Sequence, residues 1–389
     1  MNILLFNNSH LPLIGGKEIV VHHLAMSLME LGHNVVLAGP GSYRRFRHLI
    51  YPYTVFRWPR IPFLSKELTW RLLLRITRMR FKWDIVHAHT TYPNGFTAAQ
   101  LKEVTDFPLI ITPHGADIHK VPEIGFGHRL DPVKDKKICY ALDIADFTTA
   151  ISKAVEDSIA DTGLEKNKII AIPNGVDKHR FTTHVDFDVF EFLGIPRDSK
   201  VVVSVGNYHP RKGHKTLCMA TQKAHEVEPK LVVVIVGNPS QKFCQEILDQ
   251  GMGDFIKFTG SLRFPMPGST DDPDILVALL HASHAYVSAS IAEGTEGLSL
   301  ALLEAMAAKT CVIATRVSGN RDIIINNENG LLIEPGCEES LEQALISVCS
   351  DASLVTRLAE NGQQFVKKYS WLEITKLYVE LYKKTLDRS

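Results

Sequence analysis

Short runs of β-branched and apolar residues alternate with longer helical patterns along almost the whole chain, and this alternation restricts the fold more than any other feature. The runs of the first half are NILLF, NVVLAG, DIVHAH, PLIITPHG, FTTAIS and KIIAIPNG, and those after about residue 198 are VVVSVG, LVVVIVG, FIKFTG, AYVSAS, CVIAT and GLLIEP. Strands interleaved with helices form right-handed βαβ crossovers and therefore a parallel sheet. The sequence predicts an α/β fold with two doubly wound parallel sheets.

The length of the chain also favours two domains. It has 389 residues, whereas one domain usually has roughly 100 to 200. The segment between Phe181 and Lys200 breaks the alternation and ends in a Pro-Arg-Asp-Ser turn, which is typical of a connection between domains. We therefore predict Rossmann-like domains over residues 1–190 and 191–370, followed by an amphipathic helix within residues 371–389.

The composition argues against a disordered, membrane-spanning or disulfide-stabilised protein. Hydrophobic residues make up 45% of the chain and charged residues 22%, as in ordinary globular proteins. The longest apolar run, LVVVIVG, is far shorter than the roughly 20 residues that cross a bilayer, and the N-terminal MNILLFNNSH predicts a buried strand rather than a signal peptide. The six cysteines lack metal-ligand spacing, so reduced thiols, no metal site and a cytoplasmic protein are expected.

The segment 43–83 is strongly basic. It contains the single acid Glu67 and eleven basic residues, which are Arg44, Arg45, Arg47, Arg57, Arg60, Lys66, Arg71, Arg75, Arg78, Arg80 and Lys82. The segment is also rich in Phe, Tyr, Trp and Leu, a composition typical of a segment in an anionic membrane interface. An ordinary solvated helix face is an equally good interpretation. Nucleic acid is not expected as a partner, because the rest of the chain carries the compensating negative charge and would repel it.

Polar residues and glycines that follow the predicted strands mark the candidate ligand site. Open α/β sheets bind ligands beyond the carboxyl ends of their strands, at helix N-termini. In the first half, Gly15 and Gly16 precede a helix predicted to begin near Lys17 or Glu18. Glycine there allows a ligand to approach the backbone, although a simple turn is the alternative.

Three histidines follow strand-like runs of the first half. His87 and His89 lie in DIVHAHTT, and His114 lies in ITPHGAD. A histidine at a strand end can orient a substrate hydroxyl or donate to a carbonyl, or it can bond to the backbone as a structural residue. The structural interpretation is favoured for His87 and the functional one for His114. His89 and Asp117 are predicted to bind the acceptor, the second substrate of a group-transfer reaction.

In the second half, the motif VGNYHPRKG places Arg211 and Lys212 after a predicted strand and before Gly213. Lysine as a point charge and arginine as a planar fork suit a diphosphate. The alternative is an exposed basic turn. The position of this turn among the other predicted site elements favours the functional interpretation.

Two carboxylates eight positions apart, Glu296 and Glu304, flank the apolar run of EGLSLALLE. In a continuous helix this spacing is about 12 Å, too far to share one proton or metal and suitable for two ends of a nucleotide sugar. The N-H groups of Gly297, Leu298 and Ser299 are predicted to face a phosphate at the helix N-terminus. Because an unpaired acid is costly to bury, Glu304 is expected to have a partner.

Taken together, these residues resemble the retaining glycosyltransferases of family 4, the group 1 glycosyltransferases, which have the two-domain GT-B fold. The motifs GGKE, DIVHAH, TPHGAD, AISK, IPNGVDKHRF, VGNYHPRKG, EGTEGLSLALLEAMA and NGLLIEP occur in family order over nearly the whole chain. The resemblance implies two Rossmann-like domains facing across a cleft. It implies that residues 1–190 bind the acceptor, that residues 191–370 bind the nucleotide-sugar donor, and that the helix within 371–389 packs back on the first domain.

The resemblance also implies roles for individual residues. Glu296 and Glu304 match the E-x7-E motif, whose glutamates bind the donor sugar and the nucleotide ribose respectively. Lys212 is implied to contact the donor diphosphate, Gly16 to border that phosphate, and His114 to lie beside the transferred sugar. Glu296, His114 and Lys212 are therefore the predicted catalytic residues.

Three positions depart from the family pattern. Asn207 stands where the family often has arginine after the strand glycine, so one phosphate cation is missing and Arg211 is expected to replace it. Asp322 stands for the glutamate of a later motif, in VSGNRD. Glu293 is an additional acid near the sugar site and an alternative to Glu296 for part of its role.

The predicted reaction is transfer of a sugar from a nucleoside-diphosphate sugar to an acceptor hydroxyl, with retention at the anomeric carbon and without a metal or other cofactor. Uridine diphosphate is the expected nucleotide because it is the commonest in the family. The expected acceptor is a carbohydrate or lipid-linked molecule of cell-surface polysaccharide, lipopolysaccharide or glycolipid synthesis, used at the inner membrane face. The alternatives are a sugar-nucleotide epimerase or a glycogen-type phosphorylase of the same fold, and a non-catalytic sugar-nucleotide-binding protein.

Overall fold

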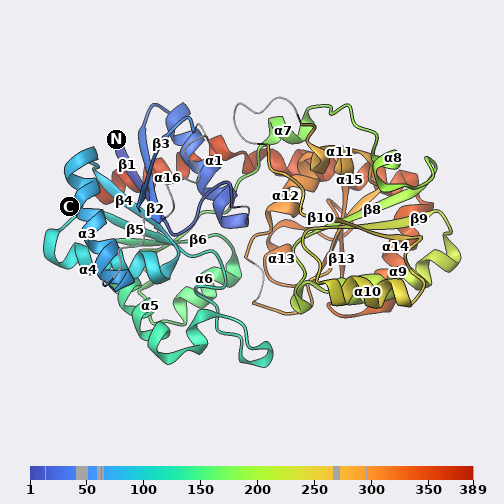
Figure 1. Ribbon diagram of the computed structural model, residues 1–389, viewed down its shortest axis with the longest axis horizontal. Helices are drawn as coiled ribbons and strands as arrows, with labels where there is room; N and C mark the ends of the chain where they lie inside the picture. Colours follow the sequence, from blue (N-terminus) through green and yellow to red (C-terminus); the bar gives the residue numbers. More distant parts are fainter. Residues whose placement is uncertain are drawn as a thin grey trace. The chain divides into compact units, whose positions relative to one another are not determined.

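The computed structural model of the protein describes residues 1–13, 15–40, 51–58, 63, 65–265, 272–294 and 297–388. The chain forms two compact units (Figure 1). The first consists chiefly of Met1–Gly175 and Trp371–Ser389, and the second of Val176–Pro265 and Ser269–Ser370. None of the described helices is long and apolar enough to cross a membrane.

The first unit is built on a parallel sheet with the strand order β3-β2-β1-β4-β5-β6-β7. Its strands are β1 (Asn2–Asn7), β2 (Asn34–Pro40), β3 (Thr54–Trp58), β4 (Ile85–His89), β5 (Leu109–Thr112), β6 (Phe147–Ala150) and β7 (Ile169–Ala171). Its α-helices are α1 (Gly16–Glu30), α3 (Lys66–Phe81), α4 (Phe96–Thr105), α5 (Pro132–Ile144), α6 (Lys153–Ala160) and α16 (Trp371–Leu386).

Helices cover both faces of this sheet. Leu4 and Phe6 of β1 and Val86 and Ala88 of β4 share one buried cluster with apolar side chains of α3, α4 and α5. Successive side chains of a strand point to opposite faces, so the intervening residues face the other layer, where α1 and α16 pack together. A strand covered on both faces is largely apolar along its length, which explains why the strand-like runs of the sequence are mostly apolar rather than alternating with polar residues.

The second unit has a parallel sheet with the strand order β10-β9-β8-β11-β12-β13. Its strands are β8 (Lys200–Val205), β9 (Leu231–Val236), β10 (Ile256–Gly260), β11 (Ala285–Ser288), β12 (Cys311–Thr315) and β13 (Leu331–Ile333). Its α-helices are α7 (Lys178–Thr182), α8 (Val189–Leu193), α9 (His214–Val227), α10 (Gln241–Asp249), α11 (Ile275–Ala282), α12 (Leu300–Ala307), α13 (Asn320–Ile323), α14 (Glu338–Ser350) and α15 (Ala352–Val366).

This second sheet is also covered on both faces. Val201 and Val203 of β8 pack in a cluster with residues of α8, α11 and α12. Val202 lies in a different cluster, with residues of α9, α10 and α14. The predicted α/β fold with two doubly wound parallel sheets is therefore confirmed, and every predicted run contains a strand.

The division between the units falls at Gly175 and Val176, earlier than the sequence-based boundary between residues 190 and 191. Val176, Phe181 and Val189 are each buried in the core of the second unit. A β-bridge also joins Val176 to Ser370. Burial of these three apolar side chains holds residues 176–190 in the second unit, while the chain from Trp371 onward belongs to the first.

Candidate functional site

Each sheet has one place where the order of its strands reverses. In the first unit it lies between β1 and β4, and in the second between β8 and β11. The connections after the two strands diverge there, which leaves room for a ligand beyond their carboxyl ends. The predicted site residues of each unit lie on or near the segments that follow these strands.

In the second unit, Arg211 and Lys212 lie on a short 3-10 turn, Pro210–Lys212, that leads from β8 into α9. Gly213 follows with φ 67°, a left-handed conformation that favours glycine. A Cβ atom on Gly213 would lie 1.9 Å from the carbonyl oxygen of Ala289, in the segment after β11. The backbone N-H of Ile291 donates to the carbonyl of Arg211 at 2.9 Å. The turn that carries the two cations is therefore fixed against the segment after β11.

Asn207, which replaces the arginine frequent in the family, bonds to the neighbouring turn. Its Oδ1 accepts a hydrogen bond from the backbone N-H of Asn238 at 3.0 Å, and the N-H of Tyr208 donates to the carbonyl of Asn238 at 2.9 Å. Asn207 thus joins the turn after β8 to the turn after β9. The cations of this turn are Arg211 and Lys212, as predicted.

Glu304 lies in the second turn of α12, and only 8% of its surface is exposed. Burial raises the pKa of its carboxyl group, the charge of Arg180 opposes the shift, and Asp274 and Asp177 add to it. Arg180 is already bound to both carboxylate oxygens of Asp274, at 2.7 and 3.2 Å. Within the described ranges, no residue donates a hydrogen bond to the Glu304 carboxylate, so its oxygens are available to donors from a ligand.

The helix α12 begins later than the sequence pattern indicated. Leu300 is its first residue and Ser299 its N-cap, without a side-chain capping bond. Gly297 and Leu298 therefore lie in the loop before the helix, and the estimate of about 12 Å for a continuous helix does not apply. The first N-H groups of any α-helix lack partners within it. Glu296 lies outside the described residues.

Glu293 holds two loops together. Its carboxylate accepts from the backbone N-H of Ser318 at 2.9 Å and forms an ion pair of 2.7 Å with Arg321. The N-H of Gly294 in turn donates to the Ser318 hydroxyl at 2.9 Å. The Glu293 carboxylate is therefore bound to residues that follow β12. Asp322, the other departure from the family pattern, is exposed in α13.

In the first unit, His89 ends β4 and forms a hydrogen bond with His114, between Nδ1 of His89 and Nε2 of His114, at 3.1 Å. Burial lowers the pKa of both rings well below the usual value, and the neighbouring charges of Lys17 and His87 lower both further. The pair is therefore neutral at pH 7.

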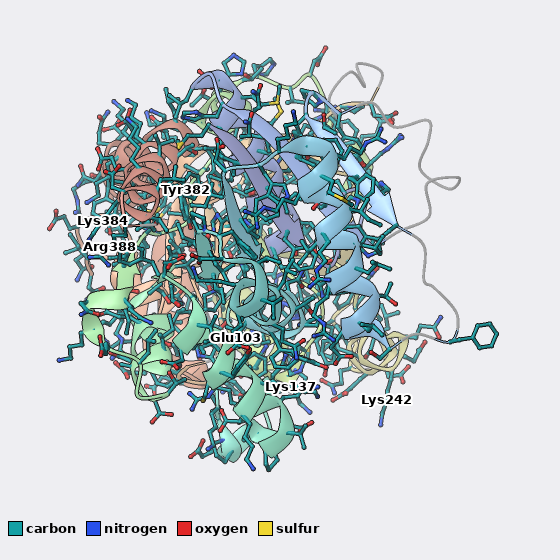
Figure 2. The ribbon with its side chains drawn as sticks, turned by 90° about the vertical axis from the view of Figure 1, so that its left-hand side faces the viewer. Glu103, Lys137, Lys242, Tyr382, Lys384 and Arg388 are labelled. Atoms are coloured by element: carbon teal, nitrogen blue, oxygen red, sulfur yellow. The ribbon has the colours of Figure 1, made fainter. Side chains whose placement is uncertain are left out.

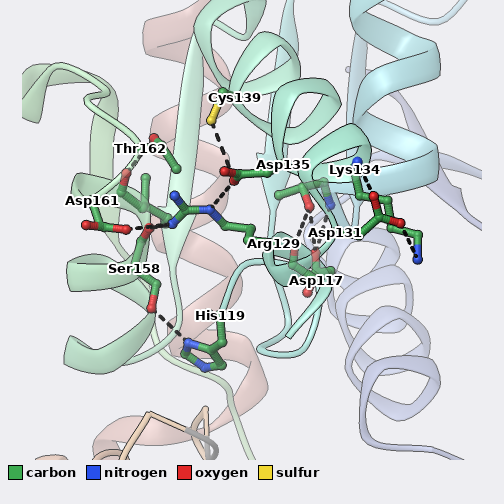
Figure 3. A network of polar contacts seen from close by, with 12 residues as sticks. Asp117, His119, Arg129, Asp131, Lys134, Asp135, Cys139, Ser158, Asp161 and Thr162 are labelled. Carbon is green, nitrogen blue, oxygen red and sulfur yellow. Dashed lines mark hydrogen bonds and ion pairs between the residues drawn. The ribbon is translucent and has the colours of Figure 1, made fainter. Parts of the chain in front are cut away.

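Asp117 fixes the loop that carries His114. One carboxylate oxygen accepts from the N-H of His114 at 2.8 Å, and the other accepts from the N-H of Thr91 at 2.8 Å. Farther along the loop, the buried Arg129 donates to Asp135 at 2.7 Å and to the carbonyl of Ser158 at 2.9 Å, as Figure 3 shows. The loop after β5 is thus anchored at both ends, and the carboxylate of Asp117 is engaged by the backbone.

Lys17 is a site residue that the sequence analysis did not select. It lies in the first turn of α1, directly after Gly16, and its charge acts on both His89 and His114. Gly15 is the N-cap of this helix and supplies no side-chain capping bond. A lysine directly after the glycine pair of the GGKE motif was the signal in the sequence, since it places a cation at the start of the helix.

Two family models together match most of the chain. The model described as Glycosyltransferase Family 4 matches residues 14–180, and the model described as Glycosyl transferases group 1 matches residues 186–365. The chain belongs to the family 4, or group 1, glycosyltransferases. It is therefore an enzyme that transfers sugars, and the predicted family is confirmed.

Several glycosyltransferases resemble this family 4 glycosyltransferase over at least 90% of their length. The D-inositol 3-phosphate glycosyltransferase of Corynebacterium urealyticum is 26% identical, over 95% of this chain and 90% of that protein. Anabaena HepE, solved with UDP and glucose, superposes with a TM-score of 0.81 and 20% identity over 99% of this chain and 100% of that one. Sucrose-phosphate synthase from Thermosynechococcus elongatus superposes with a TM-score of 0.82 and 21% sequence identity, over 100% of this chain and 100% of that one. These likenesses confirm the GT-B fold.

Proposed function

We propose that the protein transfers a sugar from a nucleoside-diphosphate sugar, with UDP as the nucleotide, to an acceptor hydroxyl with retention of the anomeric configuration. The observation that carries this proposal is the buried Glu304 carboxylate, which has no hydrogen-bond donor among the described residues. A ribose has two adjacent hydroxyl groups that can donate to one carboxylate. HepE, the related structure that contains UDP and glucose, supports this choice of donor.

Arg211 and Lys212 of the second unit are the proposed residues that stabilise the leaving diphosphate. As the bond between the anomeric carbon and the diphosphate breaks, negative charge grows on the diphosphate, and Lys212 and Arg211 stabilise it most in the transition state. The acceptor oxygen forms the new bond to the anomeric carbon on the same face, and its proton passes to the leaving phosphate oxygen. We infer that no covalent sugar intermediate, metal or other cofactor takes part.

A thermal-shift screen tests the donor. UDP, GDP and ADP are added to separate samples in buffer with EDTA, because the proposal needs no metal. At a concentration of 100 times Kd, the correct nucleotide stabilises the fold by about 2.7 kcal/mol, and we expect this shift with UDP. A shift that appears only after Mg²⁺ is added contradicts metal independence, and the absence of a shift with all three contradicts the nucleotide-sugar site. The anomeric configuration of the product, read by NMR, tests retention.

We also propose that the acceptor is a carbohydrate or a lipid-linked molecule presented at an anionic membrane surface. Phosphatidyl-myo-inositol mannosyltransferase of Mycolicibacterium smegmatis, 26% identical over 95% of this chain and 90% of that protein, is a relative named for a lipid acceptor. In this chain, Leu72 is 45% exposed and Met79 74% exposed on α3, with Arg75 and Arg80 also exposed on the helix. Arg44, Arg45, Arg47 and Arg60 of the basic segment lie outside the described residues.

Charge reversal on α3 tests membrane docking. We expect the double variant Arg75→Glu, Arg80→Glu to bind vesicles containing phosphatidylserine at least about 30-fold more weakly, because each basic residue near such a surface contributes about 1 kcal/mol. Arg78 is left in place because it donates to the carbonyl of Thr105 at 2.8 Å. Sedimentation with vesicles at low salt measures the effect.

The matched control reverses the same number of charges at the exposed Lys136 and Lys166 of the same unit. Equal losses in the two double variants would show that only net charge matters. If the wild-type protein does not bind the vesicles at low salt, the proposed docking to an anionic membrane is excluded. A soluble carbohydrate is then the remaining candidate for the acceptor.

A further inference from the structure

A chain of buried hydrogen bonds leads from α16 into the sheet of the first unit. The hydroxyl of Tyr382, which lies on α16 (Figure 2), is 2.7 Å from Nδ1 of His87. The other ring nitrogen of His87, Nε2, is 2.6 Å from the hydroxyl of Thr112 on β5. Tyr382, His87 and Thr112 are fully buried. With both nitrogens held, the His87 ring has one fixed orientation.

The fixed ring of His87 packs against the ring of His89. Residues two apart on a strand lie on the same face of the sheet, and the ring centroids of His87 and His89 are 4.2 Å apart. His89 is itself fully buried and bonds through Nδ1 to Nε2 of His114 at 3.1 Å. His89 is therefore held on one side by His87 and bonded on the other side to the candidate catalytic histidine.

The hydrogen bond between His89 and His114 contains one hydrogen atom, because both rings are neutral. If His114 donates it, the proton of His89 must lie on Nε2, which is buried and has no partner in the described part of the chain. A buried N-H without an acceptor is rare and costs about 1 to 3 kcal/mol. If His89 donates it, the buried Nε2 carries only a lone pair. The second arrangement places the proton of His114 on Nδ1.

We propose that His89 is a positioning residue that holds His114 in the tautomer protonated at Nδ1, so that His114 donates a hydrogen bond to an oxygen of the bound sugar. His87 and Tyr382 keep His89 in place. No residue among those described bonds to Nδ1 of His114, whose side chain is only partly buried. This inference rests on the proposed function for the identity of the ligand, and it gives His89 a role different from the acceptor binding predicted from its sequence.

The tautomer is measured directly, without substrate, by NMR of protein labelled with ¹⁵N-histidine. His114→Gln identifies the signals of His114. We expect the proton on Nδ1 in the wild-type protein, and a shift towards Nε2, the site favoured by free histidine, in His89→Phe. A wild-type His114 protonated at Nε2 overturns the inference, whatever the substrate of the enzyme proves to be.

Kinetics test the consequence of this tautomer for transfer. We expect His89→Phe to lower kcat by about 10²-fold, the lower end of the loss caused by removing one hydrogen-bond donor from a transition state, with the donor KM unchanged. His89→Asn should recover most of the loss, because its side-chain N-H can take the place of Nδ1. His128→Phe, at an exposed histidine of the same unit, controls for the substitution itself.

The two experiments separate the possible failures. An unchanged kcat in His89→Phe, or an Asn variant as poor as the Phe variant, overturns the positioning role. Wild-type protein that transfers no sugar from any nucleotide donor refutes the proposed function, while the NMR experiment still decides the tautomer.

Discussion

Replacement of Lys212 by alanine is expected to lower kcat/KM for sugar transfer by about 10²-fold to 10³-fold, with the fold intact. Lys212 lies on the turn that Gly213 fixes against the segment after β11, at the point of strand reversal. Its charge meets a diphosphate whose negative charge grows as the sugar leaves, and loss of one such group typically costs this much. Steady-state kinetics with the nucleotide sugar found in the thermal-shift screen measure the change.

The matched control is Lys223→Ala, at an exposed lysine of α9 in the same unit that is paired with Glu338 at 3.2 Å. We expect this control to retain wild-type activity, since surface ion pairs contribute about 1 kcal/mol or less to stability and nothing to the site. If Lys212→Ala raises only KM and leaves kcat unchanged, Lys212 binds the donor equally in the ground state and the transition state. An active Lys212→Ala enzyme would remove Lys212 from the site.

The substitution Glu304→Gln is expected to have opposite effects on the free protein and on nucleotide binding. The folded state raises the pKa of Glu304 above its ordinary value of 4.5. A raised carboxyl pKa favours folding most at pH below that ordinary value, and this contribution is lost as pH rises through the raised value. At pH 7, well above the ordinary value, the raised pKa of this buried carboxyl group therefore lowers the stability of the free protein, and glutamine removes that cost.

We accordingly expect Glu304→Gln to have a higher Tm than the wild-type protein at pH 7, with a difference that shrinks towards pH 4.5. Affinity for the nucleotide should fall by about 10-fold to 100-fold, because hydrogen bonds to a charged group contribute about 1.5 to 3 kcal/mol. Thermal melts across pH and isothermal titration with UDP measure the two effects. Glu226→Gln, at an exposed acid of α9, is the control, and equal UDP affinity in both variants would contradict the ribose contact.

Much of the fold could be predicted because doubly wound sheets bury their strands on both faces. That burial produces the strand-like runs rich in apolar and β-branched residues that the sequence analysis found for every strand except β3. The sequence TVFRW of β3 begins with the exposed Thr54 and contains the partly buried Arg57, because β3 lies at the edge of its sheet. An edge strand is covered less, so its sequence lacks the same signal.

The candidate site was predictable only as far as local patterns reach. Glycines, cations and acids after strands identified Lys212 and Glu304. Asn207, Glu293 and Asp117 each form a hydrogen bond with a residue 25 to 31 positions away along the chain. Only the folded strand order brings these distant partners together. Whether Glu296 binds the donor sugar stays a prediction.

The position of α16 has a consequence for synthesis of the protein on the ribosome. The first unit contains β1 to β7, yet it lacks a helix of its sheet layer until residues 371–386 have emerged. A nascent chain tends to fold domain by domain from its N-terminus, but here the second unit is complete in sequence before the first. Until residues 371–386 have been synthesised, His87 lacks its hydrogen bond with Tyr382, and the side of α1 that packs against α16 stays uncovered. A nascent chain that stalls before α16 is synthesised therefore exposes this surface of α1, and we expect chaperones to bind it.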